Sequence, residues 1–309
     1  MEIEFHTFNF ARMWQQFLQQ IISGNTKSLA RCISMIENEV HGYEELLQQL
    51  PANNRAKIIG ITGSPGAGKS TLTDALIGSL IIDEKKIGVL CVDPSSPFNM
   101  GALLGDRIRM SEWYNNPDVF IRSLATRGAL GGLNAKIIEI SDLMKAAGFD
   151  YIIIETVGVG QSEIDIAGLA DTTVVVLVPG SGDQVQIMKA GLMEIADIIV
   201  VNKSDYPGAD LLVKNLLTML SPVVGRNTNG IPILKTVATE KKGIEELKEK
   251  ILQHLTLASS EKKYWLLAEK AYQIIQNNKM KNVDKKMLKE KIMNSDPDKF
   301  NLYEFIKTL

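Results

Sequence analysis

The chain has 309 residues, of which 45% are hydrophobic and 23% charged, a balance typical of globular proteins and not of disordered or fibrous ones. The formal net charge of −2 offers no general electrostatic field that would attract nucleic acid or an anionic membrane, so we expect neither partner. The longest apolar runs, such as residues 172–179, are too short to span a bilayer. Cys32 and Cys91 lie far apart, which argues against a disulfide framework or a thiolate zinc site, and without a basic, apolar leader we expect a cytosolic (cytoplasmic) protein, or an organellar one whose leader has been removed.

Residues 1–55 are predicted to form a helical N-terminal extension. Apolar residues from Met13 to Ile22 recur at helical spacing, and Gly24-Asn25 ends that helix. A second helical run covers residues 29–36, and a third ends at Leu50-Pro51. Because none of these helices carries a chemical motif, we interpret the extension as a packing element.

Residues 56–256 alternate short apolar runs with helical stretches. Such alternation predicts a doubly wound α/β domain with a mostly parallel sheet and right-handed crossovers. Several of the runs are apolar on both faces, as buried parallel strands are. The predicted strands are Ile58–Thr62, Ile87–Val92, Val119–Arg122, Tyr151–Glu155, Thr173–Val178, Ile198–Val201 and Ile231–Lys235. The predicted helices are Lys69–Leu80, Leu133–Ala147, Gln184–Met193, Asp210–Leu220 and Ile244–His254.

Residues 257–309 have a different character. Trp265 and two leucines lead into a long helical pattern through Ile274 and Ile275, and a lysine-rich stretch without strand signals follows. We interpret this segment as a helical C-terminal arm whose lysines face solvent.

The strongest chemical signal is a glycine-rich loop between the first predicted strand and its helix. It fits Gly-x4-Gly-Lys-Ser, the phosphate-binding loop of nucleoside triphosphatases, in the strand–loop–helix context that the motif requires. Its glycines let backbone N–H groups face the phosphates, and the following helix adds the positive end of its dipole. We expect the lysine to reach the β- and γ-phosphates and the serine to hold Mg²⁺. The predicted nucleotide-binding residues of the loop are Gly63, Ser64, Pro65, Gly66, Ala67, Gly68, Lys69, Ser70 and Thr71.

A second signal, Asn202-Lys203-Ser204-Asp205 after a late strand, predicts that the base is guanine and the ligand GTP or GDP. The Asp205 carboxylate can accept hydrogen bonds from guanine N1–H and the 2-amino group, a donor pair that adenine lacks. We expect Asn202 to secure the loop and the Lys203 stem to lie along the ring. The segment after the next strand is expected to present a backbone N–H to guanine O6; it comprises Thr236, Val237 and Ala238.

The strand that ends at Glu155 runs into Thr156-Val157-Gly158. A carboxylate at this strand end can order Mg²⁺ and its water, and the Gly158 N–H can contact the γ-phosphate. Many GTPases carry Asp in this position of an Asp-x-x-Gly motif, and Ras-like proteins carry a water-positioning Gln where this chain has Val159. We therefore expect intrinsic hydrolysis to be slow or to rely on other groups, of which Gln161 is one candidate.

Two further acids are candidate ligands of the metal or of its water. Asp93 follows the second predicted strand, so a doubly wound topology would direct it to the phosphate edge of the sheet. Asp106 lies in Gly-Asp-Arg. The predicted metal residues are thus Ser70, Asp93, Asp106 and Glu155, and either Asp93 or Glu155 would orient the attacking water.

Together these residues resemble the MeaB/ArgK/MMAA-type G proteins, chaperones of adenosylcobalamin-dependent methylmalonyl-CoA mutase. The resemblance covers roughly residues 29–254 and rests on the blocks GSPGAGKST, VDPSSP, GALLGDRIRM, IRSLATRGALGG, ETVGVGQSE, PGSGDQVQIMKAG and EIADIIVVNKSD. The phosphate loop and the guanine motif alone would indicate only a GTPase, whereas ETVGVGQSE, PGSGD and GDRIRM are far more specific.

The resemblance implies a P-loop GTPase domain, a C-terminal arm for homodimerisation, and a partner, methylmalonyl-CoA mutase or a related acyl-CoA mutase. GTP binding and hydrolysis would gate cobalamin loading and protect or reactivate the mutase. The resemblance also implies that Lys189, in a switch-like segment, joins Lys69, Asp93 and Glu155 in catalysis. Two segments depart from the family pattern: residues 98–100 are Phe-Asn-Met where smaller, more polar residues are common, and the guanine segment has Thr-Val-Ala where Ser-Ala is usual.

Other functions remain open. A metal-insertion GTPase would need a cluster of His or Cys, but the three histidines are scattered, at His6, His41 and His254. An ATPase or kinase of an arginine and ornithine transport system, an older label of the family, conflicts with the guanine reading of Asp205, and a small-molecule kinase would need an acceptor pocket that no sequence feature marks. Four arginines could pair internally, which we favour, or act as an arginine finger: Arg107, Arg109, Arg122 and Arg127.

Overall fold

The computed structural model describes residues 2–51, 55–93, 110–126, 133–158, 165–180, 192–220, 230–257, 260–280, 283–295 and 300–307. The chain divides into two compact units, Met1–Leu266 and Leu267–Leu309. Among the helices in these ranges, none combines the length and apolarity that crossing a bilayer requires. The predicted domain boundaries at 55/56 and 256/257 stay a prediction.

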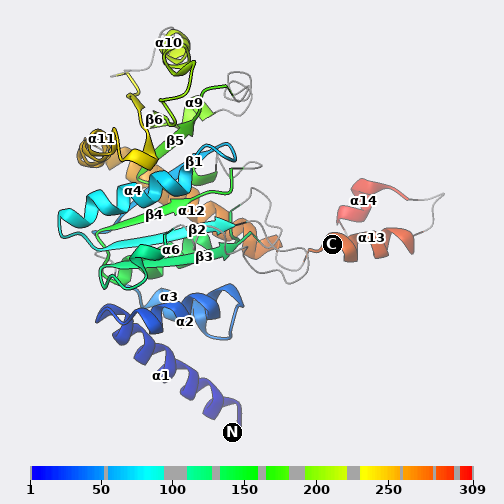
Figure 1. Ribbon diagram of the computed structural model, residues 1–309. Coiled ribbons are helices and arrows are strands. Elements are labelled where there is room, and N and C mark those ends of the chain that lie inside the picture. The colour runs from blue at the N-terminus through cyan, green and yellow to red at the C-terminus, as the bar shows by residue number, and fades with distance from the viewer. Residues whose placement is uncertain are drawn as a thin grey trace. The chain divides into compact units, whose positions relative to one another are not determined.

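The larger unit is built on a seven-stranded parallel sheet with the order β3-β2-β4-β1-β5-β6-β7 (Figure 1). All predicted strands are confirmed, and the largest extension is at β3, which runs on to Ala125. The strands are β1 (Lys57–Gly63), β2 (Ile87–Asp93), β3 (Val119–Ala125), β4 (Tyr151–Glu155), β5 (Thr172–Leu177), β6 (Ile198–Val201) and β7 (Ile233–Lys235). The order departs from β1 in both directions along the sheet, which confirms the doubly wound α/β fold.

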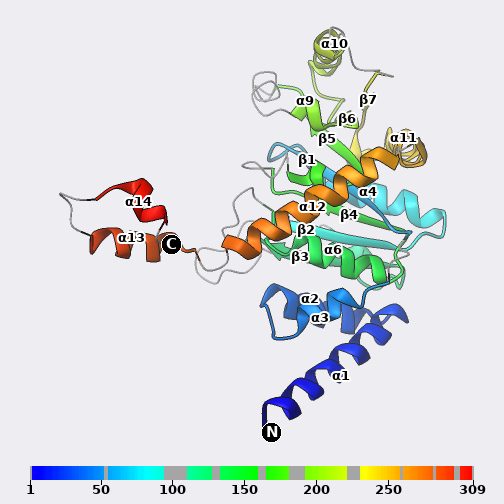
Figure 2. The ribbon, with the colours of Figure 1, turned by 180° about the vertical axis from the view of Figure 1, so that it is seen from behind.

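Helices cover both faces of the sheet because successive strand residues point to opposite sides. Ile59 and Ile61 of β1 share a buried cluster with Leu72 and Leu76 of α4 (Lys69–Ile82) and with residues of α11 (Ile244–Leu257). Gly60, between them, faces Ile166 of the 3-10 turn η2 (Ile166–Gly168) on the other side. Figure 1 shows α4 in front of the sheet, and Figure 2 shows α6 (Ile137–Ala146) on the opposite face. Helix α10 (Ala209–Leu220) packs on β5 and β6.

The predicted helix at 133–147 begins four residues late, at Ile137. Asn134 is the cause, because its Oδ1 accepts from the Lys136 N–H at 2.8 Å and its Nδ2 donates to the Ala125 carbonyl at 2.7 Å. These side-chain bonds compete with the first helical turn. Of the helix predicted at 184–193, only the end belongs to the described residues, as part of α9 (Leu192–Ile195).

The N-terminal extension forms the three predicted helices, α1 (Glu2–Ile22), α2 (Thr26–Glu37) and α3 (Tyr43–Gln48). Arg122 of β3 attaches α2 to the sheet, because its guanidinium donates to Ser34 Oγ at 2.9 Å and to the Glu37 carboxylate at 3.1 Å. Internal pairing, the favoured reading, is thus confirmed for Arg122, while the other three candidate arginines lie outside the described residues. Lys136 likewise bonds Tyr43 of α3 at 2.9 Å.

Most of the described residues of the predicted C-terminal arm are helical. They form α12 (Ser260–Met280), which begins in the larger unit, and then α13 (Lys285–Met293) and α14 (Leu302–Lys307) in the smaller one. Two short 3-10 turns of the larger unit matter for the site described next, η1 (Ser111–Trp113) and η3 (Ala238–Glu240).

Candidate functional site

The carboxyl ends of β1, β2, β4 and β6 carry the predicted polar residues. Gly63 ends β1 and leads into the phosphate loop, while Glu155 ends β4 on the neighbouring strand. Cys91 of β2 is the register partner of Glu155, so Asp93 lies two residues further toward the same edge. Asn202 directly follows β6. A doubly wound sheet binds ligands at this edge, where the strand order reverses about β1.

The phosphate loop closes on itself around Lys69. The side chain is 6% exposed, and its Nζ donates to the carbonyls of Gly63 at 2.8 Å and Ser64 at 3.1 Å. Gly68 precedes α4 in the left-handed conformation, with φ of 86°, and a Cβ there would lie 2.5 Å from Asn202 Nδ2. Glycine is therefore required at this position on both counts.

The segment after β4 lies directly on this loop. Gly158 has φ of 81°, and a Cβ there would collide with the Gly63 carbonyl and with Lys69 Nζ. Two residues earlier, Thr156 Oγ1 lies 2.9 Å from Thr62 Oγ1 in a buried hydrogen bond. The Gly158 N–H, predicted to contact a γ-phosphate, thus belongs to a backbone held against the loop.

Glu155 receives hydrogen bonds on both carboxylate oxygens from α4. Ser70 Oγ donates to Oε1 at 2.6 Å, and Thr73 Oγ1 donates to Oε2 at 3.1 Å. All three side chains are buried. Glu155 therefore contacts the predicted Mg²⁺ ligand Ser70 directly, whereas Thr73 was not among the predicted site residues. Its spacing of three residues from Ser70 places both on one helix face, which is the signal that could have found it.

The described residues suit a magnesium ion through their chemistry. Mg²⁺ prefers oxygen ligands in octahedral geometry and keeps several waters and phosphate oxygens. The Ser70 hydroxyl and the carboxylates of Glu155 and Asp93 are oxygen donors, and Asp93 is 4% exposed. Within the described ranges, no group of three or more His, Cys, Asp or Glu could hold a metal by itself. Asp106, Lys189 and Gln161 lie outside these ranges.

Asn202 joins three segments of the site. Its Nδ2 donates to the Ala67 carbonyl of the phosphate loop at 2.9 Å. Its Oδ1 accepts from Thr236 Oγ1 at 3.0 Å and from the Ala238 N–H at 3.2 Å, beyond β7. The side chain is 1% exposed. The predicted role of securing the loop has a direct counterpart in these contacts.

Lys203 and Asp205 face outward beside this junction. Lys203 adopts φ of 54°, and its Nζ donates to the Gly66 carbonyl at 2.9 Å, so its stem crosses the phosphate loop. The Asp205 carboxylate is exposed. The pKa of Lys242 is raised, first by its hydrogen bond to Glu240 and more weakly by the charge of Asp205. Because its carboxylate is exposed, Asp205 is accessible to a base with paired N–H donors.

The amides of the predicted O6 segment already have protein acceptors. The Thr236 N–H donates to the Val201 carbonyl at 2.9 Å and the Val237 N–H to the Lys242 carbonyl at 3.1 Å. The Ala238 N–H donates to Asn202 at the longer distance of 3.2 Å. Ala238 therefore has the amide that a guanine O6 could share most readily, and Thr236 serves through its hydroxyl to orient Asn202.

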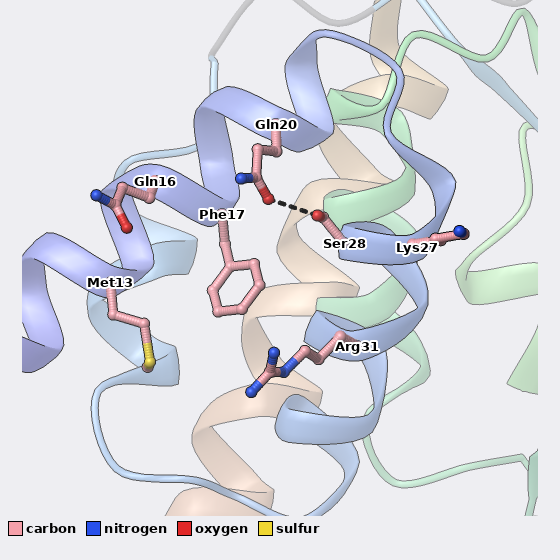
Figure 3. A pocket seen from close by; sticks show the side chains of 7 residues that line it. All are labelled: Met13, Gln16, Phe17, Gln20, Lys27, Ser28 and Arg31. Atoms are coloured by element: carbon pink, nitrogen blue, oxygen red, sulfur yellow. Dashed lines mark hydrogen bonds between the residues drawn. The ribbon is translucent and has the colours of Figure 1, made fainter.

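A pocket of about 330 Å³ lies between α1 and α2, and none of the predicted nucleotide-site residues lines it (Figure 3). Ser28 Oγ donates to Gln20 Oε1 at 2.6 Å across it, and the Arg31 guanidinium lies 5.4 Å from the Phe17 ring centroid. These contacts join the two helices, so the pocket is a feature of helix packing in the extension.

Known proteins are similar to this chain in sequence and fold. Residues 29–295 match the family model described as methylmalonyl-CoA mutase-associated GTPase MeaB. A putative GTPase of Pyrococcus horikoshii is 47% identical over 77% of this chain and 77% of its own. The GTPase ArgK of Escherichia coli is 35% identical over 77% and 75% of the two chains.

A mitochondrial methylmalonic aciduria type A homolog of Caenorhabditis elegans is 38% identical over 66% of this chain and 54% of its own. A crystal structure described as a LAO/AO transport system kinase superposes with a TM-score of 0.67, at 26% identity, over 93% of this chain and 94% of the other. The phosphate loop, the Asn202 junction and these matches agree, and the chain belongs to the family of methylmalonyl-CoA mutase-associated P-loop GTPases.

Proposed function

We propose that this protein is a Mg²⁺-dependent GTPase that gates adenosylcobalamin loading of methylmalonyl-CoA mutase, or a related acyl-CoA mutase, and protects or reactivates it. The observation that carries the proposal is the match of residues 29–295 to the family of mutase-associated GTPases. In this proposal the protein acts in the cytosol, forms a homodimer through its C-terminal arm, residues 257–309, and hydrolyses GTP slowly on its own.

Guanine recognition rests on Asp205 and its neighbours. The exposed Asp205 carboxylate would accept both donors of the guanine edge, and the Lys203 stem, held to the Gly66 carbonyl, would form the floor under the ring. Adenine would leave the carboxylate without that pair of donors, a loss that discriminates strongly between bases.

Catalysis would need positioning and charge neutralisation more than covalent chemistry. Lys69 would exchange its bonds to the Gly63 and Ser64 carbonyls for phosphate oxygens. Mg²⁺, when bound, would neutralise charge on the β- and γ-phosphates. Glu155 has both oxygens engaged by α4, so we assign the orientation of the attacking water to Asp93 and leave Glu155 to hold Ser70. Lys189 and Asp106 are proposed to complete the site.

Complex formation with a mutase tests the proposal. The purified protein is mixed with methylmalonyl-CoA mutase in the presence of GDP or of a non-hydrolysable GTP analogue, and the mixture is separated by size-exclusion chromatography. We expect co-elution whose extent changes with the nucleotide, and an unrelated cobalamin enzyme serves as the control. Failure to co-elute with this mutase and with related acyl-CoA mutases in both nucleotide states would refute the chaperone role.

The second candidate is an ATPase or kinase of an arginine and ornithine transport system. It is favoured by the structural likeness to the protein described as a LAO/AO transport system kinase. That reading requires ATP as the nucleotide, and the exposed Asp205 carboxylate opposes it because adenine cannot donate to it as guanine does. Nucleotide preference separates the two functions.

A further inference from the structure

Thr73 is a buried hydroxyl for which the proposed function has no use so far. It is 0% exposed and lies on α4, three residues after Ser70 and so on the same helix face. Both hydroxyls reach across to β4 and bond the two oxygens of one carboxylate, that of Glu155. Glu155 is therefore clamped by two donors from a single helix.

We propose that Thr73 is a positioning residue for the metal site: its hydroxyl holds the Glu155 carboxylate in the orientation in which Glu155 accepts the hydrogen bond from the Ser70 hydroxyl, so that a Ser70 lone pair is directed toward Mg²⁺. This inference rests on the proposed Mg²⁺-dependent nucleotide site. It assigns no direct contact between Thr73 and metal, nucleotide or water.

The clamp is needed because of the length of Glu155. Many GTPases carry Asp at this strand end, and Glu has one more methylene and therefore one more rotatable bond. Its terminal torsion is broad and prefers no single plane for the carboxylate. Thr, by contrast, is β-branched, and its χ1 is restricted to two main rotamers in a helix. The bond of 3.1 Å from Thr73 to Oε2 thus selects one carboxylate plane for a side chain that would otherwise sample several.

Loss of the Thr73 hydrogen bond would affect Mg²⁺ binding through Ser70. A serine hydroxyl has one proton and two lone pairs, and only a lone pair can bind a cation. The 2.6 Å hydrogen bond to Oε1 directs the O–H toward Glu155, which fixes the directions of the lone pairs. If the carboxylate turns, the Ser70 proton is no longer held. Groups that orient a metal ligand typically change metal affinity or activity by about 10–100-fold when they are mutated.

The experiment measures Mg²⁺ affinity separately from hydrolysis. Release of a fluorescent GDP analogue from the full-length protein is followed while free Mg²⁺ is raised from an EDTA-buffered start, and the midpoint of Mg²⁺-dependent retention is determined. Thr73→Val removes the hydroxyl at nearly constant shape, and we expect its midpoint to rise about tenfold. Thr73→Ser keeps the hydroxyl and should restore the wild-type midpoint to within about twofold. In EDTA, the release rate should be the same for all variants.

Ser79→Ala is the matched control, because Ser79 lies on the same helix and its hydroxyl also donates to a glutamate, Glu245, at 2.5 Å, outside the site. It should leave the midpoint unchanged. A Thr73→Val midpoint equal to that of Ser79→Ala overturns the inference, as does faster release of Thr73→Val in EDTA. If Thr73→Val does not fold, Thr73→Ala replaces it, and failure of both to fold shows a purely structural role. Wild-type protein that fails to retain GDP at any Mg²⁺ level would instead refute the proposed function.

Discussion

Asn202 allows the sharpest prediction about how the site is held together. Asn202→Ala removes three buried hydrogen bonds, to the Ala67 carbonyl, from Thr236 Oγ1 and from the Ala238 N–H. At about 1 kcal/mol for each bond, we expect the free energy of unfolding to fall by about 3 kcal/mol. Thr236→Val removes one of the three and should cost about 1 kcal/mol.

The double variant tests the shared junction. If Thr236 acts through Asn202, its bond is already lost in Asn202→Ala, so the double variant should be destabilised by about 3 kcal/mol and not by the additive sum of about 4 kcal/mol. The free energies are measured by urea unfolding followed by circular dichroism. GDP affinity of Thr236→Val should also fall, because Asn202 loses one of the two bonds that hold its Oδ1. Additive costs, or a Thr236→Val protein with unchanged stability, would show that Thr236 does not act through Asn202.

Two further predictions concern contacts outside the nucleotide site. Arg122→Ala leaves the nearly buried Glu37 carboxylate without the guanidinium that pairs with it, so we expect the free energy of unfolding in urea to fall by about 2 kcal/mol. The ion pair of Lys235 is exposed, so Lys235→Ala should change the free energy of unfolding by less than about 0.5 kcal/mol. Equal effects of the two variants would contradict this prediction. Burial raises the pKa of Asp74 above its ordinary value of 3.8, although the hydrogen bond from Trp113 opposes this. The folded state therefore binds the Asp74 proton more tightly than the unfolded state, which stabilises the fold at acid pH. This stabilisation is lost as pH rises through the raised folded-state pKa. Asp74→Asn should therefore gain stability relative to wild type between the acid range and neutrality, and a pH-independent difference would show that burial does not govern this acid.

Most of the fold followed from patterns that are local in sequence. Apolar runs of four to six residues marked each parallel strand, and several were apolar on both faces because both faces of such a strand are buried. The late start of α6 escaped prediction, since Asn134 bonds Ala125, nine residues earlier and on another element. A helical pattern carries no information about such a competing partner.

In the candidate site, likewise, only the features that are local in sequence could be predicted. The phosphate loop and the Asn-Lys-x-Asp segment were visible because their chemistry lies in consecutive residues. Their joining was not, because Asn202 meets Ala67 across 135 positions and Thr236 across 34. The backbone donor to guanine O6 stays a prediction, and local sequence could not reveal that the amides of Thr236, Val237 and Ala238 all have acceptors within the protein.

Competition between nucleotides is the most direct test of a guanine-specific site. Displacement of a fluorescent GDP analogue by GTP and by ATP is compared for wild-type protein and for Asp205→Asn. We expect GTP to displace the analogue at concentrations at least about 100-fold lower than ATP, and Asp205→Asn to lose GTP affinity and gain affinity for xanthosine triphosphate. Equal displacement by ATP and GTP, or unchanged GTP affinity of Asp205→Asn, would contradict a guanine-specific site and the GTP-driven chaperone built on it.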